Sequence, residues 1–168
     1  MVILGIDPGY AIVGYGIIEM KNSRYRPLEY GAITTKATQS FSQRLAVIYD
    51  SMTAILHKWQ PDAAAVEKLF FNSNRTTAIQ VAEARGVILL ATQQAGVSVA
   101  EYTPLQVKQA VTGYGKAQKL QVMEMTKRLL CLTQMPRLDD TCDALAMAIC
   151  HGQAAGSPLR RTILTGRI

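Results

Sequence analysis

Four acidic residues stand at the ends of predicted strands or at the start of a predicted helix, where side chains can reach a shared site. Asp7 ends the apolar run 2–6, and Glu67 ends a second short apolar run. Asp140 and Asp143 lie in the first turn of the last predicted helix, three apart and on one face. Taken singly, each has an ordinary structural explanation. A strand-end acid accepts hydrogen bonds from turn amides, and the helix dipole favours acids in a first turn.

Taken together, the four carboxylates indicate a metal site. A buried strand-end carboxylate needs either a cation beside it or a proton, because an unpaired buried charge is unfavourable. Four neighbouring carboxylates also repel one another, and the cluster makes sense if divalent cations neutralise it. The set offers only oxygen ligands, which favours Mg²⁺, with Mn²⁺ as a substitute. Two such ions about 3.5–4 Å apart would activate a water molecule and stabilise the leaving oxygen of a phosphodiester. We therefore expect Asp7, Glu67, Asp140 and Asp143 to be catalytic metal ligands.

The elements that must position these acids follow from the order of apolar patterns along the chain. Three strand-like runs joined by short turns predict an antiparallel meander. Apolar residues recur at helical spacing from Leu45 to Trp59 behind a Ser40 cap, which predicts an amphipathic helix. Strand and helix patterns then alternate, which predicts an α/β fold with a mixed sheet. The predicted strands are 2–6, 12–18, 25–35, 63–67 and 97–102, and the predicted helices are 41–59, 75–95, 105–111, 117–132 and one opening at 139.

The length and composition indicate a single domain. The 168 residues suffice for one substantial core, which we expect to span 1–153, followed by a basic, loosely ordered tail over 154–168. No apolar run approaches the roughly 20 residues of a membrane span, and no signal peptide is evident. The three cysteines form no CxxC pair, which favours a reduced, cytoplasmic protein. Cys150-His151 has no second pair with which to bind zinc.

The charge distribution points to a polyanionic partner. The chain carries eighteen basic and twelve acidic residues, a formal net charge of +6. Setting aside the four clustered acids leaves eight acidic residues against eighteen basic ones, so the rest of the chain carries +10. No acidic residue follows Asp143. An acidic, metal-binding site within a basic surface suits a nucleic-acid backbone, from which lysine and arginine displace counterions.

Six sequence blocks occur in an order that points to a known family. They are LGIDPG (4–9), GYG (14–16), VEKLFF (66–71), EARGV (83–87), VKQAVTGYGKAQKLQV (107–122) and DTCDALAMAICH (140–151). Over residues 1–152 the chain resembles the RuvC family of Holliday-junction resolvases. The resemblance implies a ribonuclease-H-like fold, here with a mixed five-stranded sheet and helices on both faces, and a homodimer. It also implies Mg²⁺-dependent nicking of two symmetry-related strands of a four-way DNA junction in recombination and repair, together with the RuvA–RuvB branch-migration complex.

The resemblance also assigns roles to single residues. The catalytic acids of the family fall on the four acids named above. Its lysines that assist DNA binding and catalysis fall on Lys108 and Lys119, of which Lys119 is the expected catalytic residue. Without the resemblance, both would be ordinary solvated helix lysines. The family's base-stacking aromatic falls on Phe70, and an exposed aromatic there could stack on an unpaired base.

The last block departs from the family pattern. Thr141 and Cys142 stand where family members usually carry small, alanine-like residues. Asp139 precedes Asp140 and lies four residues before Asp143, so Asp139 and Asp143 could also share a helical face. The spacing of the motif favours Asp140 as the ligand and leaves Asp139 as a competitor.

Two other classes of protein compete with the nuclease. An actin-like ATPase or sugar kinase also has a first strand ending in Asp near Gly, but it needs two lobes, for which 168 residues are too few. A non-catalytic junction-binding module would tolerate loss of the acids. For a homodimer, helix 75–95 is the candidate interface. Further candidates for phosphate-backbone contacts are Arg75, Arg85, Lys116 and Arg128.

Overall fold

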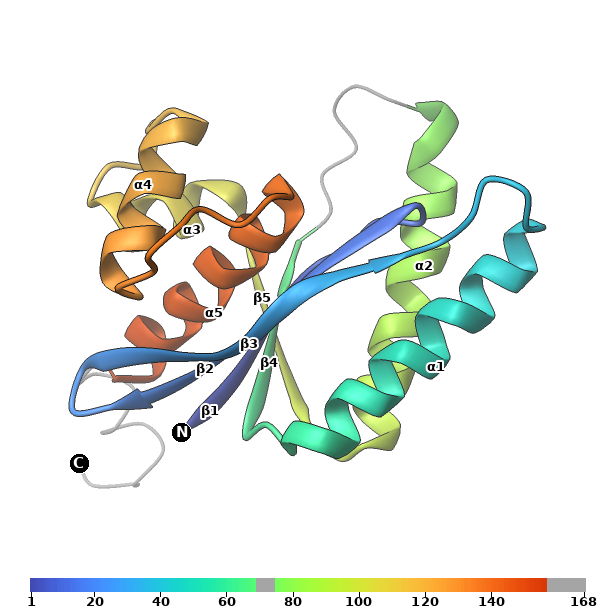
Figure 1. Cartoon of the computed structure of the whole chain (residues 1–168), viewed down its shortest axis with the longest axis horizontal. Coiled ribbons are helices and arrows are strands. Elements are labelled where there is room, and N and C mark those ends of the chain that lie inside the picture. Colours follow the sequence, from blue (N-terminus) through green and yellow to red (C-terminus); the bar gives the residue numbers. More distant parts are fainter. Residues whose placement is uncertain (69–74, 157–168) are drawn as a thin grey trace, which may run out of the picture.

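The computed structural model describes residues 1–68 and 75–156, which form a five-stranded sheet between two layers of helices (Figure 1). The strands are β1 (Val2–Asp7), β2 (Ile12–Lys21), β3 (Arg24–Thr34), β4 (Ala63–Glu67) and β5 (Ser98–Tyr102). They are ordered β3-β2-β1-β4-β5. The first three pair in antiparallel fashion, whereas β4 runs parallel to both β1 and β5. The predicted mixed sheet and its meander are confirmed.

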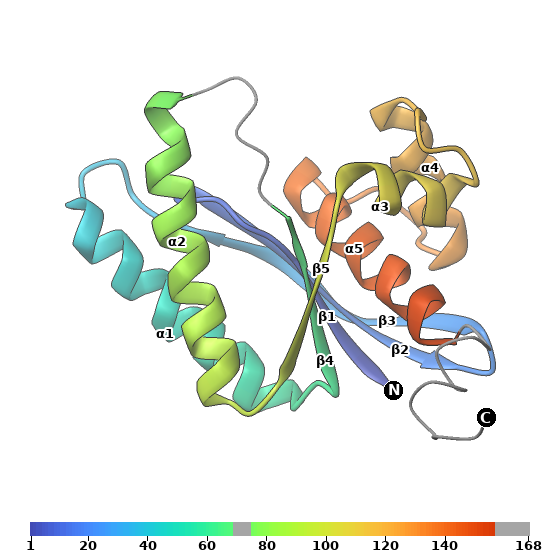
Figure 2. The ribbon, with the colours of Figure 1, turned by 180° about the vertical axis from the view of Figure 1, so that it is seen from behind.

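Helices cover both faces of this sheet, as predicted. α1 (Phe41–Trp59) and α2 (Arg75–Gln94) lie on one face, and α5 (Asp139–Gly156) crosses the other. α3 (Pro104–Thr112) and α4 (Lys119–Leu129) contact α5 on the same side of the sheet (Figure 2). The side that carries α5 therefore also carries α3 and α4. Lys108 of α3 and Lys119 of α4 lie close to the start of α5.

The alternation of side chains along β1 and β4 divides the interior into two cores. Ile3 and Ala65 pack in the core beneath α5, whereas Leu4 and Val66 pack in the core against α1 and α2. Successive side chains of a strand point to opposite faces. The last residues of β1 and β4 are in phase with Ile3 and Ala65. Both strands therefore end with a side chain on the α5 face.

Local signals set most helix boundaries. Ser40 caps α1 in a capping box with Gln43, and Thr103 caps α3 in the same way, directly before a proline. α5 begins at Asp139, as predicted, but differs from expectation in its first turn and at its end. Its first turn contains Asp139 and Asp140 but not Asp143, and it continues to Gly156, three residues into the predicted tail. Among the described residues, no helix is both long enough and apolar enough to cross a membrane.

Two strand glycines allow α5 to approach the sheet at backbone distance. A Cβ atom on Gly5 would lie 1.9 Å from the carbonyl oxygen of Ala144, and one on Gly14 would lie 2.0 Å from that of Asp140. Both separations are far inside van der Waals contact. Glycine within a strand often marks such a close approach of another backbone. Here it lets the start of α5 lie directly on β1 and β2.

We predict that Gly5→Ala destabilises the protein by at least about 2 kcal/mol, because the added methyl group must displace the backbone of α5. Gly156→Ala, at the end of α5, is the matched control, since a Cβ atom on Gly156 meets nothing within 4 Å. Its free energy of unfolding should stay within about 0.5 kcal/mol of the wild type. Urea unfolding followed by circular dichroism measures both. Equal stabilities of the two variants would contradict the close-packing role of Gly5.

Candidate active site

Asp7 and Glu67 lie at the same edge of the sheet because they end neighbouring parallel strands. The register pairs Ile6 with Val66, one residue before each acid. Both carboxylates belong to the face covered by α5, as the alternation along the strands requires. The electrostatic coupling between the two side chains agrees with this placement. The sheet thus brings together two acids that are sixty residues apart in the chain.

The start of α5 is held against this edge by two contacts. The backbone of Asp140 rests on Gly14 of β2, as the close approach described above shows. The hydroxyl group of Thr141, a buried side chain, donates a hydrogen bond of 3.0 Å to the carbonyl oxygen of Gly31 on β3. Thr141, which departs from the family pattern, therefore ties α5 to a third strand. Asp140 and Asp143 are consequently placed over the end of β1.

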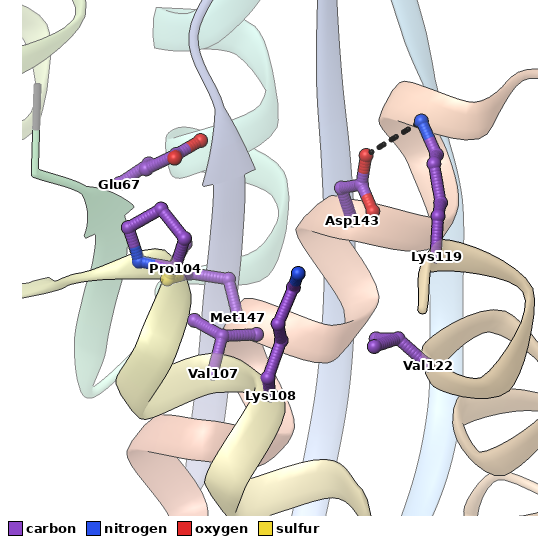
Figure 3. A pocket seen from close by; sticks show the side chains of 8 residues that line it. All are labelled: Glu67, Pro104, Val107, Lys108, Lys119, Val122, Asp143 and Met147. Atoms are coloured by element: carbon purple, nitrogen blue, oxygen red, sulfur yellow. Dashed lines mark ion pairs between the residues drawn. The ribbon is translucent and has the colours of Figure 1, made fainter. Parts of the chain in front are cut away.

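A cleft of about 240 Å³ opens beside these acids (Figure 3). Glu67 and Asp143 supply its acidic groups, and Lys108 of α3 and Lys119 of α4 supply its basic groups. The ammonium group of Lys108 points into the space between the two carboxylates (Figure 3). The remaining lining residues are apolar: Pro104, Val107, Val122 and Met147. The apolar part of the cleft was not predicted from the sequence.

Asp7 has the most perturbed carboxyl group of the site. Burial is the largest cause, and the charges of Glu67, Asp143 and Asp140 add to it, so that the pKa of Asp7 rises from 3.8 to about 8. Lys119 opposes this rise but does not cancel it. All four predicted acids therefore interact electrostatically around Asp7. Without a further cation, Asp7 is mostly protonated at neutral pH.

Glu67 and Asp143 show the same effect in weaker form. Burial raises the pKa of Glu67, and the charge of Asp143 raises it further, whereas a hydrogen bond with Asp7 opposes the rise. Burial also raises the pKa of Asp143, against the attraction of Lys119. The repulsion in the cluster is thus lowered in two ways: the raised pKa of Asp7 favours its protonated form, and Asp143 pairs with Lys119.

The contacts of Lys119 distinguish Asp139 from Asp140, the two neighbouring acids at the start of α5. Its Nζ lies 3.2 Å from Asp139 and 3.3 Å from Asp143. Burial lowers the pKa of Lys119, but the two carboxylates outweigh this and leave the pKa raised. Asp139 therefore faces the lysine, whereas Asp140 is among the charges that act on Asp7. The geometry favours Asp140 over Asp139 as the member of the acid cluster.

The donor set suits a hard divalent cation, although the side chains are not gathered around one position. The four acids provide carboxylate oxygens only, the ligands that Mg²⁺ and Mn²⁺ prefer. Within residues 1–68 and 75–156, no three His, Cys, Asp or Glu side chains converge closely enough to hold an ion. Metal binding would require Asp7 to lose its proton and Asp143 to turn from Lys119. The ligand chemistry therefore fits a hard divalent cation.

Three other sequence expectations have different outcomes. Phe70 lies outside the described residues. Lys108 lines the cleft, and its part in DNA binding stays a prediction. Arg85, expected to contact a phosphate backbone, instead has a side chain that is only 15% exposed and pairs with Glu101. It also donates a hydrogen bond to the carbonyl oxygen of Glu67. A buried arginine is hard to distinguish from a surface one by sequence, because both occur on amphipathic helices.

Comparison with known proteins identifies the family. The family model described as crossover junction endodeoxyribonuclease RuvC matches residues 3–151. The chain belongs to the RuvC family. It is 56% identical to the crossover junction endodeoxyribonuclease RuvC of Halothermothrix orenii, over 92% of this chain and 93% of that protein. The RuvC of Brevibacillus brevis is also 56% identical, over 91% and 92%.

The solved structures confirm the predicted ribonuclease-H-like fold. The structure of Thermus thermophilus RuvC in complex with Holliday junction substrate matches with a TM-score of 0.88 and 37% sequence identity. The match covers 92% of this chain and 94% of that chain. The RuvC family membership therefore extends through the whole sheet and the helices that carry the acids. It also argues against the two-lobed ATPase alternative.

We predict that the metal-free protein loses stability as the pH rises. Asp7 ionises near 3.8 when unfolded but only near 8 when folded, so the folded chain holds an extra proton between these values. The contribution of this proton to the free energy of unfolding is complete below about pH 4 and is lost as the pH approaches 8. From pH 5 to 8 in EDTA, the wild type should lose about 2–3 kcal/mol more than Asp7→Asn, measured by urea unfolding. Parallel pH profiles for the two proteins would refute the raised pKa.

Proposed function

We propose that this chain is a Holliday-junction resolvase, a DNA endonuclease that nicks symmetry-related strands of a four-way junction in recombination and repair. The observation that carries the proposal is the electrostatic action of Glu67, Asp140 and Asp143 on Asp7, beside a cleft that two lysines line. It occurs in a chain that matches a crossover junction endodeoxyribonuclease family over nearly its whole length. Acids at this density, next to cationic groups, suit hydrolysis of a phosphodiester.

The proposed cofactor is Mg²⁺, with two ions per subunit and with Mn²⁺ as a substitute. Bound ions would supply an activated water molecule and stabilise the leaving oxygen. Burial and the charges of neighbouring carboxylates raise the pKa of both Asp7 and Asp143. A bound divalent cation would favour their ionised forms and so offset this effect. The donor types and the coupled carboxylates support the proposal. Asp7, Glu67, Asp140 and Asp143 are the proposed ligands.

The two lysines are proposed to act on the phosphate. Lys119 neutralises Asp143 while no metal is bound, and its ammonium group lies at the rim of the cleft. Once Asp143 turns to a cation, Lys119 is available to stabilise negative charge on the transferred phosphate. Lys108 points into the same cleft and is placed to hold the DNA backbone. The charge of +10 outside the four acids supports DNA binding.

The proposed enzyme is a homodimer joined through α2. A four-way junction has two-fold symmetry, so paired nicks require two active sites related by a two-fold axis. The outward face of α2 carries Ile79, Glu83, Gly86 and Leu90 in one stripe, and the two apolar side chains are 68% and 52% exposed. Exposed apolar residues at helical spacing are typical of a helix that pairs with another copy.

Two further parts of the proposal follow from family membership alone. We place the protein in the cytoplasm, where bacterial recombination intermediates occur, and we propose that it acts with the RuvA–RuvB branch-migration complex. The assembly that we propose is this chain together with RuvA and RuvB on one four-way junction.

A nicking assay on a synthetic four-way junction tests the proposal. The wild type should cleave with Mg²⁺ and be inactive in EDTA, because the carboxylates need the cation to act on the phosphate. Asp7→Asn should abolish cleavage while junction binding, measured by gel shift, survives. Binding without cleavage in the wild type would support a non-catalytic junction-binding module instead. Loss of binding in a folded Asp7→Asn variant would contradict the separate roles of acids and basic surface.

Asp139→Asn and Asp140→Asn form a matched pair within the same assay. Asp140→Asn should lower the cleavage rate at least about 100-fold, because it removes a proposed ligand beside Asp7. Asp139→Asn should stay within about 10-fold of the wild type, because Asp139 pairs with Lys119 and both side chains are more than half exposed. A reversed order of the two variants would make Asp139 the ligand.

We predict that Ile79→Asp converts the dimer to a monomer, because a buried charge opposes an apolar contact. Sedimentation velocity measures the change, and paired nicking should give way to single nicks. Tyr30→Ser, which alters an exposed apolar residue on β3, is the control and should leave the dimer intact. A dimeric Ile79→Asp protein would exclude this face of α2 as the interface.

A further inference from the structure

One contact outside the cleft joins α2 to the strand end that carries Glu67. Arg85 lies in the middle of α2, and its side chain is largely buried. Its Nε donates a hydrogen bond of 3.3 Å to the carbonyl oxygen of Glu67. Its guanidinium group also forms an ion pair with Glu101 of β5. Arg85 thus reaches the end of β4 from the face of the sheet opposite to the cleft.

The peptide group between Glu67 and Lys68 has one partner in the sheet. The N–H of Lys68 donates to the carbonyl oxygen of Tyr102 on β5 at 2.8 Å. The N–H and C=O of a trans peptide point in opposite directions. The carbonyl of Glu67 therefore points away from β5 and toward β1, where the strand ladder would have to supply its donor.

The ladder has no donor to offer at this point. β1 and β4 are parallel and pair Ile6 with Val66. In a parallel ladder, the Glu67 carbonyl would then receive its hydrogen bond from the N–H of residue 8. Residue 8 is a proline and has no N–H. Pro8 therefore leaves an acceptor unmatched at the edge of the site, and Arg85 supplies the missing donor.

We propose that Arg85 is a positioning residue for the catalytic carboxylate of Glu67. The hydrogen bond fixes the peptide group of Glu67 where the ladder with β1 ends, and this fixes the direction in which its side chain leaves the strand. The carboxylate is thereby held at the edge of the sheet where its charge acts on Asp7. The inference rests on the proposed nuclease function, in which Glu67 is a ligand. It replaces the expectation that Arg85 contacts DNA.

The ion pair with Glu101 offers a matched control. Glu101 is 42% exposed, and surface pairs of this kind contribute little by themselves. Glu101→Gln removes the ion pair but leaves the hydrogen bond from Arg85 to Glu67. Arg85→Met removes both and keeps a side chain of similar apolar length. Arg85→Lys keeps a side-chain N–H donor toward the carbonyl oxygen of Glu67. Its cleavage rate and Mn²⁺ affinity should therefore lie between those of Arg85→Met and the wild type.

The test combines four measurements on the full chain. They are the single-turnover cleavage rate of a saturating junction, the Mg²⁺ concentration for half-maximal rate, junction affinity in EDTA, and Mn²⁺ binding to DNA-free protein by calorimetry. Arg85→Met should cleave about 10–100-fold more slowly and bind Mn²⁺ about 10-fold more weakly, as is typical when the support of a metal ligand is lost. Its junction affinity in EDTA should stay within about 2-fold of the wild type, and Glu101→Gln should behave as the wild type.

Several results would overturn the inference. Weaker junction binding in EDTA for Arg85→Met, in proportion to the lost rate, would make Arg85 a DNA contact. Equal losses for Glu101→Gln and Arg85→Met would assign the effect to the ion pair. If Arg85→Met does not fold, Arg85→Lys with wild-type Mn²⁺ affinity and rate supports the donor role, and an inactive but stable Arg85→Lys opposes it. A wild type that cleaves in EDTA would instead contradict the proposed metal-dependent function.

Discussion

Repulsion among carboxylates at one edge of a sheet is the constraint on which the rest of this structure depends. Asp7, Glu67 and Asp143 are each partly removed from water, and the charges of Glu67 and Asp143 both act on Asp7, so the three negative charges need a counter-charge. The metal-free chain meets this constraint with a proton on Asp7 and with the ammonium group of Lys119 against Asp143. Both are arrangements that a divalent cation can displace.

Holding such a cluster together requires a rigid scaffold, because the repulsion between the carboxylates falls when they move apart. The parallel pairing of β1 and β4 sets the distance between their last residues. α5 is fixed to the sheet by backbone contacts at Gly5 and Gly14 and by the hydrogen bond from Thr141 to β3. On the opposite face, Arg85 holds the end of β4. Strong repulsion in the site is thus balanced by close packing beneath it.

Much of this was predictable because it follows from local sequence signals. Short apolar runs that stop at a polar residue predicted β1 and β4, and helical spacing behind Ser40 predicted α1. The strand-ending positions of Asp7 and Glu67 were therefore known, and the resemblance to the RuvC family named the partner acids on α5. A glycine within a strand can mark the close approach of another backbone, but nothing in the sequence says which element makes that approach. The placement of Asp143 in the first turn of α5 was wrong, because the acids of that turn are Asp139 and Asp140.

The sequence by itself determined the kinds of elements, their order, the four acids and the basic character of the rest of the chain. These depend on neighbouring residues and on composition, which are both written along the chain. Only the tertiary structure decided that Asp139 pairs with Lys119 while Asp140 acts on Asp7, and that Arg85 supports β4 instead of facing solvent. These outcomes depend on the distance between residues far apart in sequence, and that distance is set by strand register and by the packing of α5 on the sheet.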